Sequence, residues 1–155
     1  MPLDQVLGSL EIKTNGEGFR DLTSPINSWI KKNGIEKGII NITALHTSCS
    51  ITINENADSR VLKDLSEYIK AIVPEEYFCS IKDNSNKFNY THSDEGIDDM
   101  PAHIKTALTN TSISLSINDG EMVLGQWQAV YLWEHRYKGN NRTLCLHAIG
   151  EMNYK

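Results

Sequence analysis

The sequence predicts an α+β fold made mainly of antiparallel β-sheets, with two main helices and one short helix. Two observations carry this prediction. Alternating or β-branched segments occur near both ends of the chain, and helical periodicity is confined to three stretches between them. In the C-terminal third, tight-turn sequences at Asp119-Gly120 and at 138–141 separate short strands, as in antiparallel hairpins. No repeat or linker divides the chain, so we expect residues 1–155 to form a single domain.

The first third of the chain should alternate strands with a helix. Apolar residues two positions apart over 6–12 indicate a half-buried strand. Ser24 resembles a helix N-cap that is followed by proline at the first helical position, and Gly34 ends that helix. The isoleucine-rich segment 39–46 and the short β-branched segment 49–54 should be the next two strands.

A longer helix should follow over 56–72, because its apolar residues recur on one face. Either Asn56 or Asp58 can cap it, and Pro74 stops it. Residues 80–90 are polar and fit either an edge strand or a long loop. After them we expect a short third helix and then antiparallel strands, at 99–108, 112–118, 121–127, 128–136 and 142–150.

Composition places the chain among ordinary soluble proteins, since it is 39% hydrophobic and 23% charged. The formal net charge of −5 argues against a nucleic-acid partner, whose phosphates attract basic surfaces. No apolar run approaches the roughly 18 residues of a membrane helix, and the N-terminus lacks the apolar region of a signal peptide. Three cysteines without a CxxC pair fit reduced thiols. We therefore expect a cytoplasmic protein that binds neither membrane nor nucleic acid.

The segment 92–103, HSDEGIDDMPAH, holds the densest group of metal-capable side chains, with His92 and His103 on either side of four carboxylates. Imidazole ligands favour zinc, and a carboxylate majority favours magnesium or manganese. The spacing of the histidines matches no zinc motif, and a solvated acidic loop before a capped helix is the alternative. The density of ligand types nevertheless indicates a divalent metal site.

Two further polar segments lie where strands end. In HTS, residues 46–48, a histidine suited to metal or acid–base work stands beside two hydroxyls that suit phosphate oxygens. The alternative is that these hydroxyls satisfy local backbone groups. In NENAD, residues 54–58, helix capping explains Asn56 but accounts less easily for Glu55, which is therefore a candidate site residue.

The segment WQAVYLWEHR, residues 127–136, combines a strand with polar side chains. Alternation puts Glu134 on an apolar face and suggests that it points inward beside Arg136. A buried carboxylate needs a cation or hydrogen-bond donors, so the pair is either structural or part of a metal or substrate site. Trp127 and Gln128 follow a glycine and would suit a flat heteroaromatic ring, although a core tryptophan is the more common explanation.

In their order along the chain, these segments resemble the YjbQ family over about residues 5–151. The resemblance rests on HTSCSITINENAD, VPEE after the long helix, YTHSDEGIDDMPAHIK, LGQWQAVYLWEHR and a closing IGE. Members of this family are described as secondary thiamine-phosphate synthases. The resemblance implies an α+β fold, a homotrimer and a divalent metal ion bound by histidines.

Residue by residue, the match covers the positions for which we expect roles in a site. The expected ligands of a zinc or magnesium ion are His46, His92 and His103. The expected catalytic or orienting carboxylates are Glu55, Asp99 and Glu134. The expected substrate contacts are Thr47, Ser48, Asn54, Asn56, Trp127, Gln128, Arg136 and Arg142. The three histidines should lie within about 5 Å of one another or share one ion, because zinc–ligand distances are near 2 Å.

We expect a metal-dependent enzyme of small phosphorylated metabolites. The resemblance gives thiamine-phosphate synthase-type transfer as the named activity, in which an aminopyrimidine-methyl diphosphate joins a thiazole phosphate and diphosphate departs. A cation and fixed donors would stabilise the charge on the departing group. Two alternatives stay open, namely metal-assisted hydrolysis with Glu55 as base, and a non-catalytic, metal-stabilised trimeric binding module.

Overall fold

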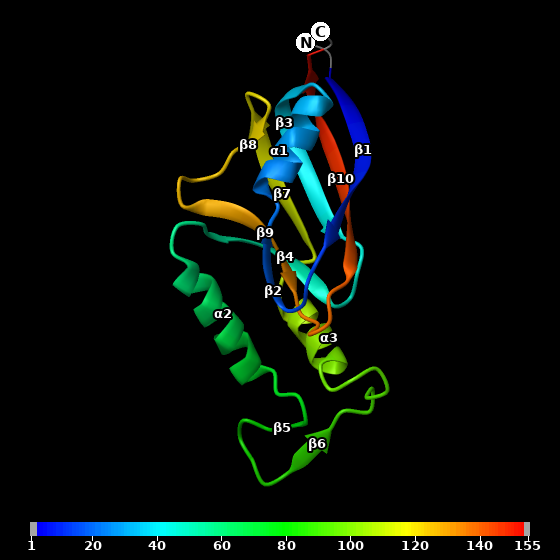
Figure 1. Cartoon of the computed structure of the whole chain (residues 1–155), viewed down its shortest axis with the longest axis vertical. Coiled ribbons are helices and arrows are strands. Elements are labelled where there is room, and N and C mark those ends of the chain that lie inside the picture. Colours follow the sequence, from blue (N-terminus) through cyan, green and yellow to red (C-terminus); the bar gives the residue numbers. More distant parts are fainter. Residues whose placement is uncertain (1–2, 154–155) are drawn as a thin grey trace.

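Residues 3–153 are described by the computed structural model, in which two antiparallel sheets enclose the main hydrophobic core (Figure 1). The larger sheet has the strand order β1-β10-β3-β7-β8. Its strands are β1 (Leu3–Lys13), β10 (Asn141–Met152), β3 (Ile35–Ala44), β7 (Ser112–Asn118) and β8 (Glu121–Met122). The smaller sheet has the order β2-β9-β4, with β2 (Gly18–Asp21), β9 (Gln128–Glu134) and β4 (Cys49–Glu55). The predicted α+β fold with mainly antiparallel sheets is confirmed.

The core lies between the two sheets and helix α1 (Thr23–Lys32). Alternation along β3 and β10 turns side chains such as Ile40 and Leu144 inward, and α1 adds Ile26 and Ile30, all of them fully buried. Each such side chain contributes about 1.5–3 kcal/mol relative to an exposed one. β9 is buried on both faces because Val130 and Leu132 face the main core, whereas Trp133 on the other face packs with Ile69 of α2 and with Val73.

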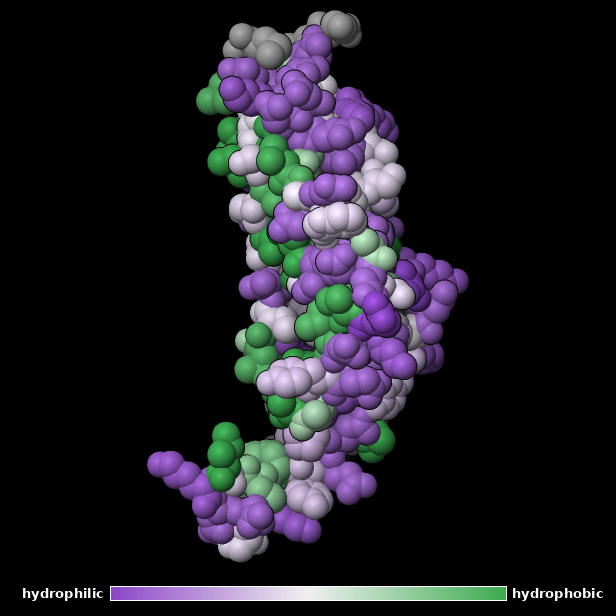
Figure 2. Space-filling model, turned by 90° about the vertical axis from the view of Figure 1, so that its left-hand side faces the viewer, coloured by the Kyte–Doolittle hydropathy of each residue, from purple (hydrophilic) through white to green (hydrophobic). Residues whose placement is uncertain are grey.

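Helix α2 (Ser59–Ile72) and a small hairpin extend away from this body (Figure 1). Asp58 caps α2 by accepting a hydrogen bond from the backbone N–H of Arg60 at 3.0 Å. The hairpin consists of β5 (Tyr77–Cys79) and β6 (Lys87–Asn89). Figure 2 shows apolar side chains exposed on this lower end of the molecule. Among residues 3–153, no helix combines the length and apolar character needed to cross a membrane.

Several local expectations are corrected. α1 begins at Thr23, and its N-cap is Leu22 rather than Ser24. The segment after the Asp119-Gly120 turn pairs only over the two residues of β8, and residues 123–127 follow as irregular chain. Residues 80–90 hold the turn and second strand of the small hairpin. Strand β2 was not predicted, because Gly18 at its start and Gly16 before it resemble strand breakers.

Candidate metal centre

The candidate metal centre forms at the start of helix α3 (Asp99–Leu108), whose predicted bounds are confirmed. Asp99 and His103 are four residues apart, so one turn of helix places them on the same side. His92 reaches them from the preceding loop. That loop turns at Gly96, whose φ of 108° is one that L side chains rarely adopt. A glycine turn and one helical repeat thus bring the three side chains together.

The three side chains converge on one carboxylate oxygen. One ligand atom from each of His92, Asp99 and His103 lies within 4.8 Å of the other two. His92 Nε2 is 2.7 Å and His103 Nε2 is 3.6 Å from Asp99 Oδ2. The Asp99 side chain is 3% exposed, whereas the imidazoles are 48% and 32% exposed. The carboxylate is therefore fixed within the protein, and the two rings border solvent.

The other ring nitrogen of His103, Nδ1, is held by a backbone group. His103 Nδ1 lies 3.0 Å from the backbone carbonyl oxygen of Thr47. A carbonyl oxygen only accepts hydrogen bonds, so Nδ1 donates to it, and Nε2 is the ring nitrogen that faces Asp99 Oδ2 and could bind a metal ion. Histidines that bind metals commonly donate the other N–H to a carbonyl or carboxylate in this way.

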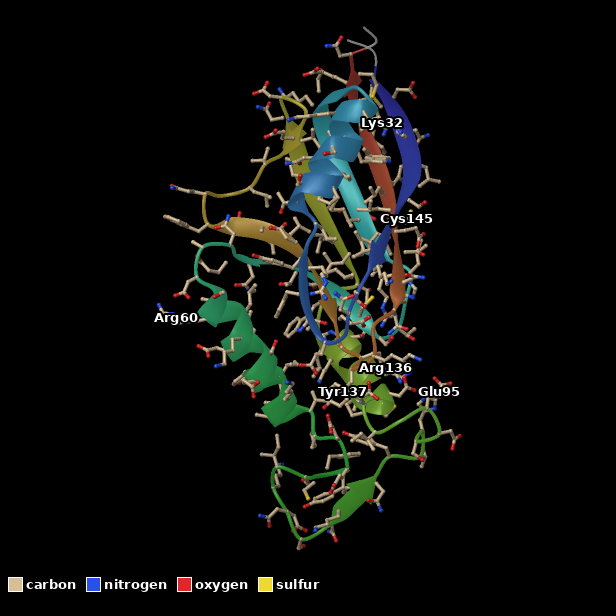
Figure 3. All side chains as sticks on the ribbon, viewed as in Figure 1. Lys32, Arg60, Glu95, Arg136, Tyr137 and Cys145 are labelled. Atoms are coloured by element: carbon tan, nitrogen blue, oxygen red, sulfur yellow. The ribbon has the colours of Figure 1, made fainter. Side chains whose placement is uncertain are left out.

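Arg136 contacts Asp99 and the acidic residues that precede it in the loop. Its guanidinium contacts Asp99 Oδ1 through Nη1, donates from Nε to Asp98 Oδ2 at 3.0 Å and from Nη2 to the Glu95 carbonyl at 2.9 Å. Tyr137 N–H also donates to Asp98 Oδ2, at 2.9 Å. Figure 3 places Arg136 and Tyr137 beside α3, with Glu95 on the neighbouring loop. These contacts orient Asp99 so that its other oxygen faces the histidines.

The donor set fits a divalent cation. Two imidazole nitrogens and one carboxylate oxygen suit zinc better than magnesium, which prefers an all-oxygen shell. A cavity of about 160 Å³ adjoins His92 and is bordered by Met100 and Pro101 from α3 and by Glu75 and Glu76 after α2. Three protein ligands leave a coordination position open, and the neighbouring cavity would let a small molecule reach it.

His46 lies outside this group. The expected three-histidine cluster is therefore corrected, within the described chain, to two histidines and one aspartate. His46 Nε2 accepts a hydrogen bond from the backbone N–H of Thr143 at 2.8 Å, so this nitrogen is already engaged. Burial, followed by the positive charge of Arg142, holds the pKa of His46 below its ordinary value, which favours the neutral ring that this bond requires.

Glu134 is sealed in the protein and pairs with Arg142 rather than with Arg136. It is 0% exposed, and its Oε1 and Oε2 accept from Arg142 Nε at 2.9 Å and Nη2 at 2.5 Å. Thr14 Oγ1 donates to Glu134 Oε1 at 2.7 Å. Ser48 Oγ accepts from Arg142 Nη2 at 2.9 Å. The prediction that Glu134 points inward is confirmed, but its ion pair is with Arg142, and Arg136 contributes only a backbone N–H at 3.4 Å. The Glu134 carboxylate is thus saturated by internal donors.

The second predicted segment lies at the opposite end of β4. β4 spans seven residues, which at about 3.3 Å per residue separates Glu55 from the His103–Thr47 contact by roughly 20 Å. Glu55 Oε1 accepts from the N–H of Ala57 at 3.2 Å. Within one chain, Glu55 therefore does not reach the metal centre.

The residues around Glu55 form a turn with their own hydrogen bonds. Asn56 Nδ2 donates to the carbonyls of Gln126 and Gln128 at 3.1 and 3.2 Å. Gln128 Oε1 accepts from the N–H of Gly125 at 2.7 Å, and Asn54 Oδ1 accepts from that of Glu55 at 2.9 Å. Trp127 is 58% exposed, so it is not a core residue. Of the predicted substrate contacts, only Thr47, Ser48, Arg136 and Arg142 lie near the metal centre or contact its immediate neighbours.

His135 was not singled out from the sequence as a site residue. It is 1% exposed, its Nε2 is 2.8 Å from Ser50 Oγ, and its Nδ1 has no hydrogen-bond partner among the described residues. Burial, assisted by the positive charges of Lys105 and Arg142, lowers the pKa of His135 to about 3. Alternation turns only one of two neighbouring strand residues inward, so the pattern that predicts an inward Glu134 gave no signal for a buried His135.

Comparisons with known proteins agree with this fold and these segments. The family model described as UPF0047 protein YjbQ-like matches residues 8–151. A UPF0047 protein of Synechocystis is 40% identical over 143 residues, covering 92% of this chain and 90% of that protein. The UPF0047 protein YjbQ of Escherichia coli is 34% identical over 144 residues, covering 92% and 96%.

Solved structures show the same architecture. A YbjQ-like protein of unknown function from Sulfolobus solfataricus has a TM-score of 0.80 at 20% identity, covering 97% of this chain and 100% of that one, which shows the fold. An uncharacterized yjbq/upf0047 family protein from Clostridium acetobutylicum has a TM-score of 0.72 at 27% identity, covering 91% and 97%. The sequence matches and the shared architecture together show that this chain belongs to the UPF0047 (YjbQ-like) protein family.

Proposed function

We propose that this chain is a metal-dependent enzyme of small phosphorylated molecules, with His92, Asp99 and His103 as the ligands of its divalent ion. The observation that supports the proposal is the convergence of two imidazole nitrogens and one carboxylate oxygen within 4.8 Å, beside a cavity. No other set of three His, Cys, Asp or Glu side chains within residues 3–153 converges in this way. Catalytic zinc sites characteristically have three protein ligands and an open position, whereas structural sites are closed by four.

Neighbouring residues would fix the three ligands and leave one coordination position of the ion open. Thr47 sets the ring orientation of His103, and Arg136 sets that of the Asp99 carboxylate. A divalent ion held there would polarise a phosphoryl oxygen and lower the pKa of a bound water. Arg136 and Arg142 are both engaged by carboxylates, which leaves neither guanidinium free for a departing diphosphate. The arrangement therefore favours hydrolysis, in which water adds to phosphorus, the P–O bond breaks and the alcohol leaves with a proton.

Thiamine-phosphate synthase-type transfer is the second candidate, and the resemblance to the YjbQ family is its main support. The structure adds no free guanidinium to this support, because Arg142 Nη2 already bonds Ser48 Oγ at 2.9 Å and pairs with the buried Glu134. This reaction would join the two heterocyclic phosphates and release diphosphate.

A homotrimer is proposed as the working assembly, again from the resemblance. The exposed apolar side chains of α2 and the hairpin support it, because Tyr68, Ile72, Phe78 and Phe88 are between 43% and 68% exposed. Sedimentation at micromolar concentration should give about three times the chain mass of 17.5 kDa. A stable monomer would contradict this part of the proposal.

Zinc binding by wild type, His103→Ala and His147→Ala tests the metal centre. His147 is a matched control, because its imidazole bonds Gln5 on β1 and is not among the metal-centre ligands. We expect one zinc per chain for wild type and His147→Ala, and at least about a 100-fold weaker affinity for His103→Ala. Equal affinity in all three proteins would contradict the site.

Activity then separates the candidate functions. The zinc- or magnesium-loaded wild type should release phosphate from small phosphate esters, and His103→Ala should not. Formation of thiamine phosphate from the two heterocyclic phosphates would instead support the transfer reaction. Tight metal binding with neither activity would favour the non-catalytic binding module.

A further inference from the structure

We infer a second ligand site, for the phosphate group of a small molecule, between the β1–β2 and β9–β10 turns. The two turns lie side by side at the end of the sheets nearest α3 (Figure 1). A cavity of about 430 Å³ opens between them. It is lined by Lys13, Thr14, Asn15, Lys138, Gly139, Asn140 and Asn141. None of these residues carries a carboxylate, although the chain as a whole has a net charge of −5.

The charge of the cavity points to an anion. Within residues 3–153, the ammonium groups of Lys13 and Lys138 have no ion pair or side-chain hydrogen bond. Each ammonium therefore keeps three free donors, and Asn15 and Asn141, whose side chains carry amide donors, also line the cavity. Charge-assisted hydrogen bonds to phosphate oxygens are about twice as strong as neutral ones, so a phosphate group matches this lining better than a neutral ligand does.

The two turns are held in place before any ligand binds. Thr14 N–H donates to the Asn140 carbonyl at 2.8 Å, and Asn140 N–H donates to Thr14 Oγ1 at 2.9 Å. Thr14 Oγ1 in turn donates to the buried Glu134 carboxylate at 2.7 Å. A Cβ on Gly139 would lie 2.2 Å from the Thr14 carbonyl oxygen, so only glycine permits this approach. A preorganised pair of turns lowers the entropic cost of binding.

The buried Glu134–Arg142 pair would then help to fix the turns that carry the two lysines, because Glu134 accepts a hydrogen bond from Thr14 in one of them. Lys138 is two residues beyond Arg136, which holds the metal ligand Asp99. The cavity thus supplies unpaired cations close to a metal centre whose nearby arginines are already paired. Its use as the phosphate subsite of the enzyme rests on the proposed function, whereas phosphate binding itself does not.

Titration of metal-free protein with inorganic phosphate and pyrophosphate at constant ionic strength tests the inference. Two charge-matched double variants are compared, Lys13→Gln with Lys138→Gln, and Lys32→Gln with Lys63→Gln. The second pair removes two exposed lysines from α1 and α2, away from the cavity. Backbone amide shifts report where the anions bind.

We expect saturable binding of both anions to wild type, with the largest shifts at Asn15 and at residues 139–141. The Lys13/Lys138 variant should bind pyrophosphate about tenfold more weakly, and the Lys32/Lys63 variant should stay within about twofold of wild type. Equal weakening in both variants, shifts centred elsewhere, or no saturable binding would overturn the site. Tighter binding of a single-stranded oligonucleotide through the same lysines would overturn the assignment to a small ligand.

The result is separable from that of the metal centre. Phosphate binding in metal-free protein is expected even if zinc binding fails, because none of the lining residues is a metal ligand. Conversely, loss of phosphate binding in the Lys13/Lys138 variant should leave zinc affinity unchanged.

Discussion

Glu134 pairs with Arg142 and Asp99 pairs with Arg136, and the two ion pairs differ in what surrounds the second carboxylate oxygen. We call the first the sealed pair and the second the open pair. Both carboxylates are nearly inaccessible, at 0% and 3% exposure. Every neighbour of the Glu134 oxygens is an internal donor. Asp99 instead gives one oxygen to Arg136 and turns the other toward two imidazoles that border solvent. Burial alone therefore does not distinguish a candidate site from a structural ion pair, whereas the neighbours of the second carboxylate oxygen do.

The largest expected effect is on the sealed pair. Arg142→Ala should lower the free energy of unfolding by about 3–5 kcal/mol, because it leaves Glu134 charged, buried and without its cation. Urea denaturation measures this change. Arg60→Ala is the control, since Arg60 pairs with Asp58 at the surface and should leave the unfolding midpoint nearly unchanged. Similar midpoints for both variants would show that the Glu134 pair is not a structural centre.

The buried His135, which follows Glu134 in the sequence, should make the unfolding free energy depend on pH. The pKa of its imidazole falls from 6.5 to about 3 through burial, then through the charges of Lys105 and Arg142. Between these pH values the unfolded chain binds a proton that the folded chain does not, so the unfolding free energy should fall as pH decreases, by up to about 1.4 kcal/mol per pH unit. His135→Gln should flatten this slope in denaturant titrations from pH 7 to pH 4. An unchanged slope would contradict the assignment.

A smaller effect, on zinc affinity, is expected for Arg136, which holds the Asp99 carboxylate in the open pair. Arg136→Gln should weaken zinc binding by about 10- to 100-fold, because Asp99 loses the contact that orients its carboxylate. Calorimetric titration with zinc measures this, with Arg60→Gln as the charge-matched control. Unchanged affinity would mean that Arg136 stabilises the loop without shaping the metal centre.

The smallest effect is expected at His46. Because Nε2 of His46 already accepts from Thr143, His46→Ala should change zinc affinity by no more than about twofold. The same zinc titration applies. A tenfold loss would restore His46 as a ligand and contradict the two-histidine centre.

The sequence predicts the parts of this site that depend on local geometry. The bounds of α3 follow from helical periodicity and from Pro101 in the first turn, and the four-residue spacing of Asp99 and His103 puts them on one side of the helix. The orientation of His46 could not be predicted in this way, because it depends on a backbone donor 97 residues away.

The partner of Glu134 was missed for a related reason. Alternation correctly turns Glu134 inward, but β9 ends at this residue, so the alternating pattern does not extend to Arg136. The chain bends there, and Arg136 meets α3 while Arg142 returns on β10 to face Glu134. Strand β2 was missed because its pairing with β9 is long-range, with Gly18 opposite Glu134.

Zinc titration of Asp99→Asn beside Glu134→Gln tests the central claim most directly. Each change removes one carboxylate charge with little change in volume. We predict that Asp99→Asn binds zinc at least about 100-fold more weakly while remaining folded, whereas Glu134→Gln keeps wild-type affinity at temperatures where it is folded, although it unfolds more easily. Full zinc affinity in Asp99→Asn, together with its loss in folded Glu134→Gln, would contradict the assignment of the open pair as the metal centre.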